Sequence, residues 1–205
     1  MLANLTIKEY LQKTASNTAL PGGGSGAALS AAVAAGLVEM VANLTIGKKG
    51  FEAVEAQMKK IAKQASKSRQ RLTEQIDRDS DAYNQVMTAF KMPRETEAQK
   101  KMRSEAIQNG LKQAARVPLG VAQDALEIIE LAREVVAKGN KNAVTDGAVG
   151  VMMARTAAMG ALFNVKINLS AIKDSDFVRQ VAAQVTQLEK EIIIKEKEIL
   201  AQVKI

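Results

Sequence analysis

Cysteine and histidine are both absent from this chain of 205 residues. Their absence excludes disulfides, thiol nucleophiles and zinc sites built from Cys and His. It also removes the side chain that most often moves protons near neutral pH. Any catalysis by this chain must therefore use carboxylates, lysine, tyrosine, hydroxyl groups or the backbone. The lack of cysteine also fits a reducing compartment.

Aromatic residues and proline are scarce. Aromatic side chains make up 3% of the chain, tryptophan is absent, and there are only three prolines. The core must therefore be built from alanine, leucine, isoleucine, valine and the nine methionines. Long stretches rich in Ala, Lys, Glu and Gln favour helix over strand, and no alternating apolar pattern is long enough to predict a sheet. We predict an all-α fold, a single-domain bundle of about five or six long helices in which residues 1–205 form one domain.

Long apolar runs are missing as well. Lys8, Glu9 and Lys13 interrupt the N-terminus before any apolar segment of a signal peptide. The longest run of low polarity, residues 26–38, is dominated by alanine and is too short to span a membrane. We therefore expect a cytoplasmic protein with no membrane partner.

The net charge of +7 can attract either nucleic acid or an anionic small molecule. The basic residues are spread over several predicted helices, and no aromatic residues are interleaved with them to stack on bases. This pattern favours an anionic small molecule, and we expect no nucleic-acid partner.

Periodicity, capping patterns and breaks divide the chain into helices. Thr6 and Glu9 have the spacing of a capping box. The segment 164–169 is expected to be a break between two helices. The predicted helices are 6–16, 23–46, 51–91, 96–138, 142–163 and 174–205.

A glycine cluster precedes the second predicted helix. Pro21 is followed by Gly22, Gly23, Gly24 and then Ser25, where an alanine-rich segment begins. Glycines let the backbone approach a ligand closely, and the first N–H groups of a helix can bind an anion or a carbonyl oxygen. The cluster matches neither the phosphate-binding loop nor the dinucleotide motif, because both follow a strand. Close helix packing explains most of the small residues behind it.

Asp79 lies on the apolar stripe of the helix 51–91, with Tyr83 one turn later, whereas Asp77 and Asp81 lie off this stripe. A carboxylate that faces a core is costly unless it is paired, hydrogen-bonded or protonated. Burial would raise its pKa toward a value useful for proton transfer at neutral pH. A buried salt bridge to an arginine on another helix would explain the same position, and the sequence leaves both explanations open.

Asp146 is expected in the first turn of its helix, after Asn142 or Thr145 as the cap. An acid at this place complements the helix dipole, so a structural role is the simpler explanation. The same helix face continues through small residues to Asn164. Such a face permits close approach of another helix, either within the bundle or across a dimer.

Four motifs then occur in order: Pro21–Ser25 before an alanine-rich helix, Asp77–Tyr83 (DRDSDAY), Gly139-Asn140 followed by Thr145-Asp146, and the segment NVKINL at 164–169. In this order and spacing they resemble the cyclodeaminase/cyclohydrolase family. This is the folate-processing domain at the C-terminal end of formiminotransferase-cyclodeaminase, which also exists as a stand-alone bacterial protein. The resemblance covers essentially the whole chain.

The resemblance implies an all-helical homodimer that acts on a tetrahydrofolate and needs neither a metal nor a further cofactor. One family activity closes 5-formiminotetrahydrofolate to 5,10-methenyltetrahydrofolate and releases ammonia, and the other interconverts 5,10-methenyl- and 10-formyltetrahydrofolate. The family pattern places the essential acid at Asp79 first and Asp77 second, with Asp146 as an orienting or second acid–base group. Substrate-binding positions are then expected at Pro21, Gly22, Gly23, Gly24, Ser25, Tyr83, Asn142 and Asn164.

A carboxylate with a raised pKa suits either reaction, because hydrolysis needs a base for water and deamination needs an acid for ammonia. The hypothesis favours methenyltetrahydrofolate cyclohydrolase, since the sequence shows no formiminotransferase domain that would feed a deaminase. The cyclodeaminase is the alternative. A third possibility, from another class, is a helical scaffold that pairs through its C-terminal amphipathic helix and binds no folate.

Overall fold

The computed structural model describes residues 1–204 and contains only helices and loops within that range. Five helices are long and one, near the N-terminus, is short, which confirms the predicted all-α bundle. Three single-turn 3₁₀ helices accompany them. The elements are η1 (Leu2–Asn4), α1 (Ile7–Thr14), α2 (Gly23–Asn43), η2 (Glu52–Val54), α3 (Glu55–Phe90), α4 (Glu97–Lys138), η3 (Lys141–Ala143), α5 (Val144–Leu169) and α6 (Ser175–Leu200).

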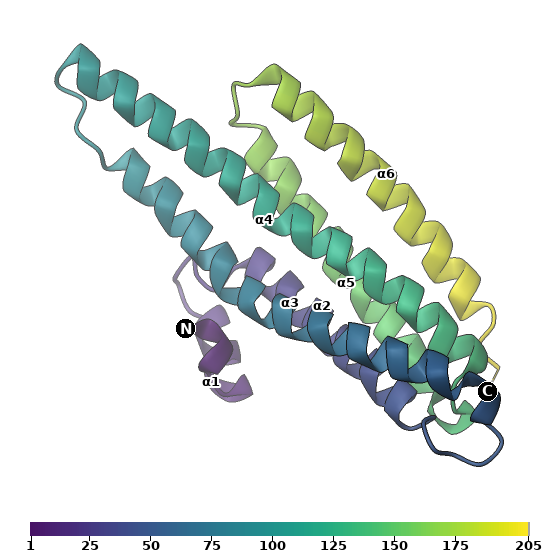
Figure 1. Ribbon diagram of the computed structural model, residues 1–205. Coiled ribbons are helices and arrows are strands. Elements are labelled where there is room, and N and C mark those ends of the chain that lie inside the picture. The colour runs from purple at the N-terminus through teal and green to yellow at the C-terminus, as the bar shows by residue number, and fades with distance from the viewer. Residues whose placement is uncertain (205) are drawn as a thin grey trace.

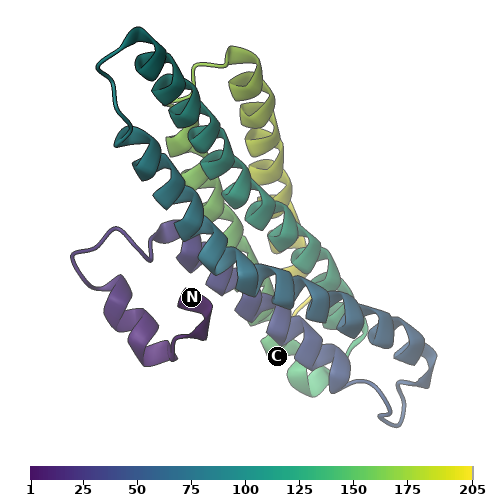
Figure 2. The ribbon, with the colours of Figure 1, turned by 60° about the vertical axis from the view of Figure 1, so that its left-hand side comes forward.

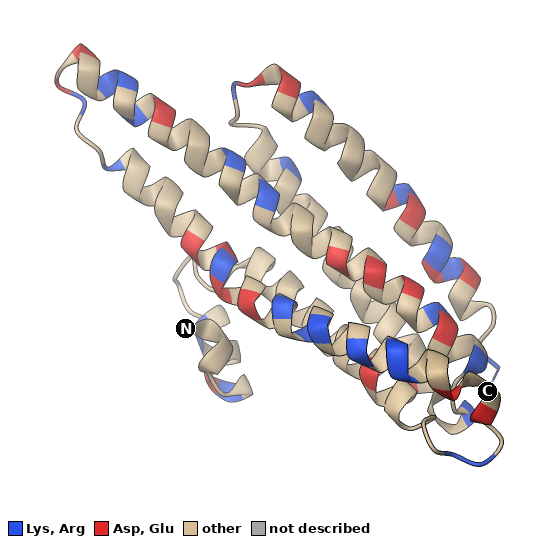
Figure 3. Cartoon of the chain, viewed as in Figure 1, with Lys and Arg blue, Asp and Glu red and all other residues tan. Residues whose placement is uncertain are grey.

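Helices α2 to α5 form the bundle, each antiparallel to the one before it (Figure 1). α2 packs on α3 and α5, α4 packs on α3 and α5, and α6 lies along α5 and α4. The N-terminal arm, residues 1–20, stands beside this bundle (Figure 2): η1 contacts α3, and α1 projects to the side with Tyr10 buried against the core. Lys and Arg occur along α3, α4 and α6, mixed with acidic residues (Figure 3).

Small residues bring α2 and α5 close to their neighbours. The buried side of α2 is almost entirely alanine, and α5 buries several alanines and glycines. Gly150, for example, would place a Cβ 3.5 Å from the Ala34 carbonyl oxygen and from the Leu37 and Val38 side chains. The larger buried side chains that fill the remaining space include Met58, Leu72, Ile128, Leu162 and Ile192.

The predicted break at residues 164–169 was wrong, because α5 continues through it to Leu169. The side-chain amide of Asn164 donates to the Gly160 carbonyl at 2.9 Å, and that of Asn168 donates to the Asn164 carbonyl at 2.8 Å. These asparagines therefore bond to the turn before them instead of interrupting the helix. Val165 and Leu169 are buried and continue the apolar stripe.

Two further expectations are corrected. Tyr83, predicted on the inward stripe of α3, is 40% exposed, and Phe90, two turns later on the same stripe, is 47% exposed. Secondly, the apolar run 26–38 belongs to α2, which is long and apolar enough to cross a membrane by length and composition, as is the segment Lys141–Leu169. In the most apolar 18-residue window of each segment, 56% and 50% of the residues are buried, as in core helices, and the other residues are half-buried or exposed.

Candidate functional site

A cavity lies at the N-terminal end of α2, because this helix is shorter than α5 and much shorter than α3 and α4. α2 has 21 residues and α3 has 36, which correspond to about 31 and 54 Å. Where α2 begins, α3, α4 and α5 continue beyond it (Figure 1). The space left over is a cavity of about 460 Å³ with Gly22, Gly23 and Gly24 at one end.

Asp79 of α3 faces this cavity and is held by the first turn of α2. The Ser25 hydroxyl donates to Asp79 Oδ2 at 3.1 Å, and the Ser25 backbone N–H donates to the same carboxylate. That N–H belongs to the first turn of α2 and has no partner within the helix. Within residues 1–204 no Lys or Arg forms an ion pair with Asp79, so the buried salt bridge that the sequence left open is not found.

Burial raises the pKa of the Asp79 carboxyl, and the hydrogen bonds from the Ser25 side chain and backbone lower it. Desolvation is the larger effect, so the pKa lies above its ordinary value. A carboxyl tuned in this way can both accept and return a proton nearer to neutral pH than an exposed aspartate can.

The close approach of α2 to Asp79 depends on Gly24. A Cβ built on Gly24 would lie 2.5 Å from Asp79 Cγ and 2.7 Å from Oδ2, and closer still to Oδ1. Any other residue at this position would displace the carboxylate. Gly23 is less demanding, since its Cβ would lie 3.4 Å from Asn164 Nδ2. Pro21, joined to Leu20 by a cis peptide bond, is buried and is not among the residues that line the cavity.

The cavity wall is polar near Asp79 and apolar farther away. Asn164 and Asn168 of α5 line the polar part. Their amide N–H groups bond to backbone carbonyls, including that of Ala114 at 3.1 Å from Asn168, which leaves both amide oxygens as free acceptors within residues 1–204. The apolar part is lined by Tyr83, Val86, Met87, Phe90 and Ile167.

Of the predicted binding residues, Gly22, Gly23, Gly24, Tyr83 and Asn164 line the cavity together with Asp79. Ser25 does not line it: its side chain is fully buried beneath Asp79. Asn168 and Ile167 also line the cavity but were not predicted, because both fall in the segment expected to be a break. A helix extended through that segment would have placed Asn168 one turn after Asn164 on the same face.

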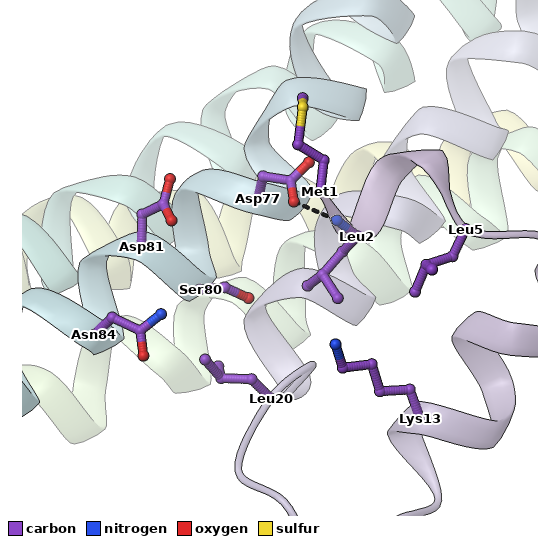
Figure 4. A pocket seen from close by; sticks show the side chains of 9 residues that line it. All are labelled: Met1, Leu2, Leu5, Lys13, Leu20, Asp77, Ser80, Asp81 and Asn84. Atoms are coloured by element: carbon purple, nitrogen blue, oxygen red, sulfur yellow. Dashed lines mark hydrogen bonds between the residues drawn. The ribbon is translucent and has the colours of Figure 1, made fainter.

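Asp77 lies on a different side of α3. Its carboxylate accepts hydrogen bonds from the backbone N–H groups of Leu2, at 2.5 Å, and Ala3, at 3.3 Å. It thereby fastens the N-terminal arm to α3 and lines a second pocket under this arm (Figure 4).

Asp146 and Asn142 lie at the far end of α5 from this cavity. Asp146 is in the first turn of α5, and Asn142 is exposed in η3. About five helical turns, roughly 27 Å, separate Asp146 from Asn164 along α5. Within one chain, therefore, the structure does not bring Asp146 and Asn142 together with Asp79.

Comparison with known proteins relates this chain to a family. The family model described as formiminotransferase-cyclodeaminase matches residues 6–187. The chain is 39% identical to a methenyltetrahydrofolate cyclohydrolase of Methylorubrum extorquens over 180 residues, which cover 88% of this chain and 86% of that protein. It is 33% identical over 187 residues to the formimidoyltransferase-cyclodeaminase of Sus scrofa, covering 91% of this chain but only 35% of the longer pig protein.

The fold has a close counterpart among solved structures. The crystal structure of a formiminotetrahydrofolate cyclodeaminase from Thermotoga maritima superposes with a TM-score of 0.89 at 28% identity, covering 99% of this chain and 98% of that one. Sequence and fold therefore agree over nearly the whole length, and the chain belongs to the formiminotransferase-cyclodeaminase family of folate one-carbon enzymes.

Proposed function

We propose that this protein is a methenyltetrahydrofolate cyclohydrolase whose acid–base group is Asp79. The observation that carries the proposal is the position of Asp79, which faces a cavity, has a raised pKa and has hydrogen-bond donors but no cation as partners. The extensive similarity to the cyclohydrolase of Methylorubrum extorquens supports this choice of reaction.

Asp79 would serve in both halves of the hydrolysis. As a water oxygen bonds to the methenyl carbon, the carboxylate takes a proton from that water and a hydroxylated carbon between N5 and N10 results. The carbon–N5 bond then breaks, N5 receives the proton from the Asp79 carboxyl, and the hydroxyl proton is lost to solvent as the formyl group forms on N10. A raised pKa makes both transfers accessible to one carboxyl.

The cavity suits a folate in shape and polarity. Its volume is within the range of small-molecule sites. The amide oxygens of Asn164 and Asn168 can accept from pteridine N–H groups, while Tyr83 and Phe90 offer aromatic surface to the rings. The free N–H groups at the start of α2 can bind an oxygen of the one-carbon unit.

The glutamate tail of the folate would extend along α3 toward its C-terminal end. Phe90 lies about 16 Å from Asp79 along the helix. It borders a separate hollow of about 610 Å³ at the α3–α4 turn. Lys91, Arg94 and Arg103 line this hollow. Their positive charge would favour the tail carboxylates.

The cyclodeaminase remains the second candidate, because the Thermotoga maritima protein of nearly the same fold and length bears that name. In that reaction N10 bonds to the formimino carbon and the N10 proton passes to the formimino nitrogen. A protonated Asp79 then gives its proton to the same nitrogen, the bond between this nitrogen and the carbon breaks, and the nitrogen leaves as ammonia.

Absorbance of the methenyl compound separates the candidates. Loss of methenyl absorbance on addition of the protein supports the hydrolase, and a gain from 5-formiminotetrahydrofolate supports the deaminase. No change with either substrate, and no thermal shift with a folate, would leave the helical scaffold as the better explanation.

We propose that no metal or further cofactor takes part, so activity should survive dialysis against a chelator.

We also propose a homodimer formed through α2 and α5. Val33 and Met40 of α2 and Met152, Phe163 and Ile167 of α5 are exposed on these adjacent helices. Between Gly23 and Asn43 the only charged residue is Glu39. Helices that are apolar on every side are normally covered, and a two-fold dimer would cover the same surface on both copies.

A two-fold axis near the middle of α5 would also give Asp146 a route to the site. With the two α5 helices antiparallel, the Asp146 end of one copy lies near the Asn164 end of the other. Asp146 would then act, as an orienting or second acid–base group, on the cavity of the partner copy.

The dimer is tested by the mass in solution. Met152→Glu should convert the protein to a monomer, because it buries a charge in the proposed interface. Ile194→Glu on the exposed side of α6 is the matched control and should leave the mass unchanged.

With the apolar halves of α2 and α5 covered in this way, we propose a cytoplasmic protein without a membrane partner. Recovery of the wild type in the soluble fraction without detergent is the corresponding check.

A further inference from the structure

The hydroxyl group of Ser25 has more acceptors around it than it has hydrogens. Its side chain is fully buried, and Oγ lies 2.9 Å from the Ile76 carbonyl oxygen, 3.1 Å from Asp79 Oδ2 and 3.3 Å from Ser80 Oγ. A hydroxyl has one hydrogen and two lone pairs. Ser25 therefore donates either to the carbonyl or to the carboxylate at any moment, and the arrangement of its neighbours determines which.

Ser80 is the neighbour whose role the reaction scheme does not yet include. It is 7% exposed, and within residues 1–204 its hydroxyl has one hydrogen-bond partner, Ser25. Ser80 also lines the second pocket, of about 370 Å³, between α3 and the N-terminal arm (Figure 4). The two hydroxyls thus lie between this pocket and the cavity that Asp79 faces.

We propose that Ser80 is a positioning residue for Asp79: it donates to Ser25 Oγ, so that Ser25 directs its own hydrogen to the Asp79 carboxylate. The inference rests on the proposed role of Asp79. When Asp79 takes a proton, the Ser25 hydrogen turns to the Ile76 carbonyl and Ser25 Oγ can accept from the carboxyl O–H. Both hydroxyls only rotate, and neither gains or loses a proton. The network therefore serves both charge states of Asp79 without moving a heavy atom, which is the condition for low reorganisation during reaction.

Other titratable groups near this network come from α1, α3 and the first residue of the chain. Tyr83 of α3 lines the Asp79 cavity, and Met1, which carries the terminal amino group, lines the second pocket. Asp77 and Asp81 of α3 and Lys13 of α1 line the second pocket. Tyr10 of α1 is buried, and burial together with the charge of Asp79 raises its pKa. Within residues 1–204, the side chains of α2, α4 and α5 that line the Asp79 cavity are uncharged. The pH profile of one Ser80 variant must therefore be compared with that of another Ser80 variant, because both keep all these groups.

The test compares Ser80→Thr with Ser80→Val, which have the same shape but differ in the hydroxyl. Loss of one neutral hydrogen bond changes a rate or an equilibrium constant by about 2- to 10-fold. We expect Ser80→Val to lower kcat by this factor on the acidic side of the pH profile and to move the acidic limb to higher pH, with KM unchanged. Ser80→Thr should restore both. Ser68→Ala, at another buried serine of α3, is the control and should behave as wild type.

Identical pH profiles for the Thr and Val variants would overturn the inference. Direct titration of the Asp79 carboxyl by carbon-detected NMR gives the same comparison without turnover, and it should show a higher pKa in Ser80→Val than in Ser80→Thr. If Asp79→Asn retains full activity, the proposed function itself fails. If Asp79→Asn is inactive while the Thr and Val variants coincide, only the role of Ser80 fails.

Discussion

Gly24→Ala is the substitution whose effect follows most directly from the geometry of the site. The added Cβ would lie 2.5 Å from Asp79 Cγ, whereas ordinary contacts begin at 3.4 Å. The carboxylate must therefore move by about 1 Å or more, and a displacement of that size costs on the order of 100-fold in rate. We expect kcat/KM to fall by about this factor, with most of the loss in kcat.

The fold should survive the same change. Alanine favours the helix over glycine by about 1 kcal/mol, which offsets part of the roughly 1–3 kcal/mol that overpacking costs. Circular dichroism and thermal unfolding are therefore expected to differ little from wild type.

Gly26→Ala is the matched control for Gly24→Ala. A Cβ at Gly26 meets nothing within 4 Å, although the two glycines are only two residues apart in α2. The control should keep wild-type activity and gain stability. If Gly24→Ala retains activity within about twofold of wild type, a range that small backbone effects can produce, then the placement of Asp79 against the start of α2 is refuted as a requirement for turnover.

Three further predictions concern the carboxylates. Asp79→Asn should abolish most turnover yet stabilise the fold. Because burial raises the Asp79 pKa, the wild type loses stability as the pH rises from the ordinary aspartate pKa through the raised one. The variant has no carboxyl at this position and should not lose stability over this pH range. Its melting temperature should exceed that of wild type above this window and coincide with it below the ordinary pKa; a lower melting temperature throughout would contradict the cause assigned to the shift. Asp77→Ala should release the N-terminal arm, increase its cleavage by protease, and destabilise the protein by about 1–3 kcal/mol, while unchanged protease sensitivity would refute its anchoring role. Co-expressed Asp79→Asn and Asp146→Asn chains should recover about one quarter of wild-type activity if Asp146 acts across a two-fold dimer, and none if it acts within its own chain.

Periodicity predicted the long helices because their apolar stripes are long and regular. Thr6 and Glu9 form the predicted capping box, and α4 ends at Lys138 as expected. The stripe also placed Asp79 on the side of α3 that meets α2. Local pattern was sufficient in these cases because each depends on residues three or four apart in the chain.

The same pattern failed where a side chain finds its partner only in the folded helix. The segment 164–169 was expected to be a break, but Asn164 and Asn168 each bond to a carbonyl one turn earlier and the helix continues. Tyr83 and Phe90 fit the inward stripe of α3 but border a cavity, because α2 does not extend far enough to cover them. That difference in helix length is a property of the whole bundle and is not encoded by any one stripe.

The two aspartates of the DRD sequence show why spacing alone could not assign their roles. They are two residues apart on α3, so their side chains point in different directions. Asp77 binds the backbone N–H groups of Leu2 and Ala3 and closes the N-terminal arm onto the bundle. Asp79 meets the start of α2, where Ser25 favours its charged form while burial opposes that form more strongly. A cation beside Asp79 would hold it ionised and unable to return a proton. Hydrogen-bond donors without a cation let burial raise the pKa of Asp79. A raised pKa is what a single carboxyl needs if it is to act first as a base and then as an acid nearer to neutral pH.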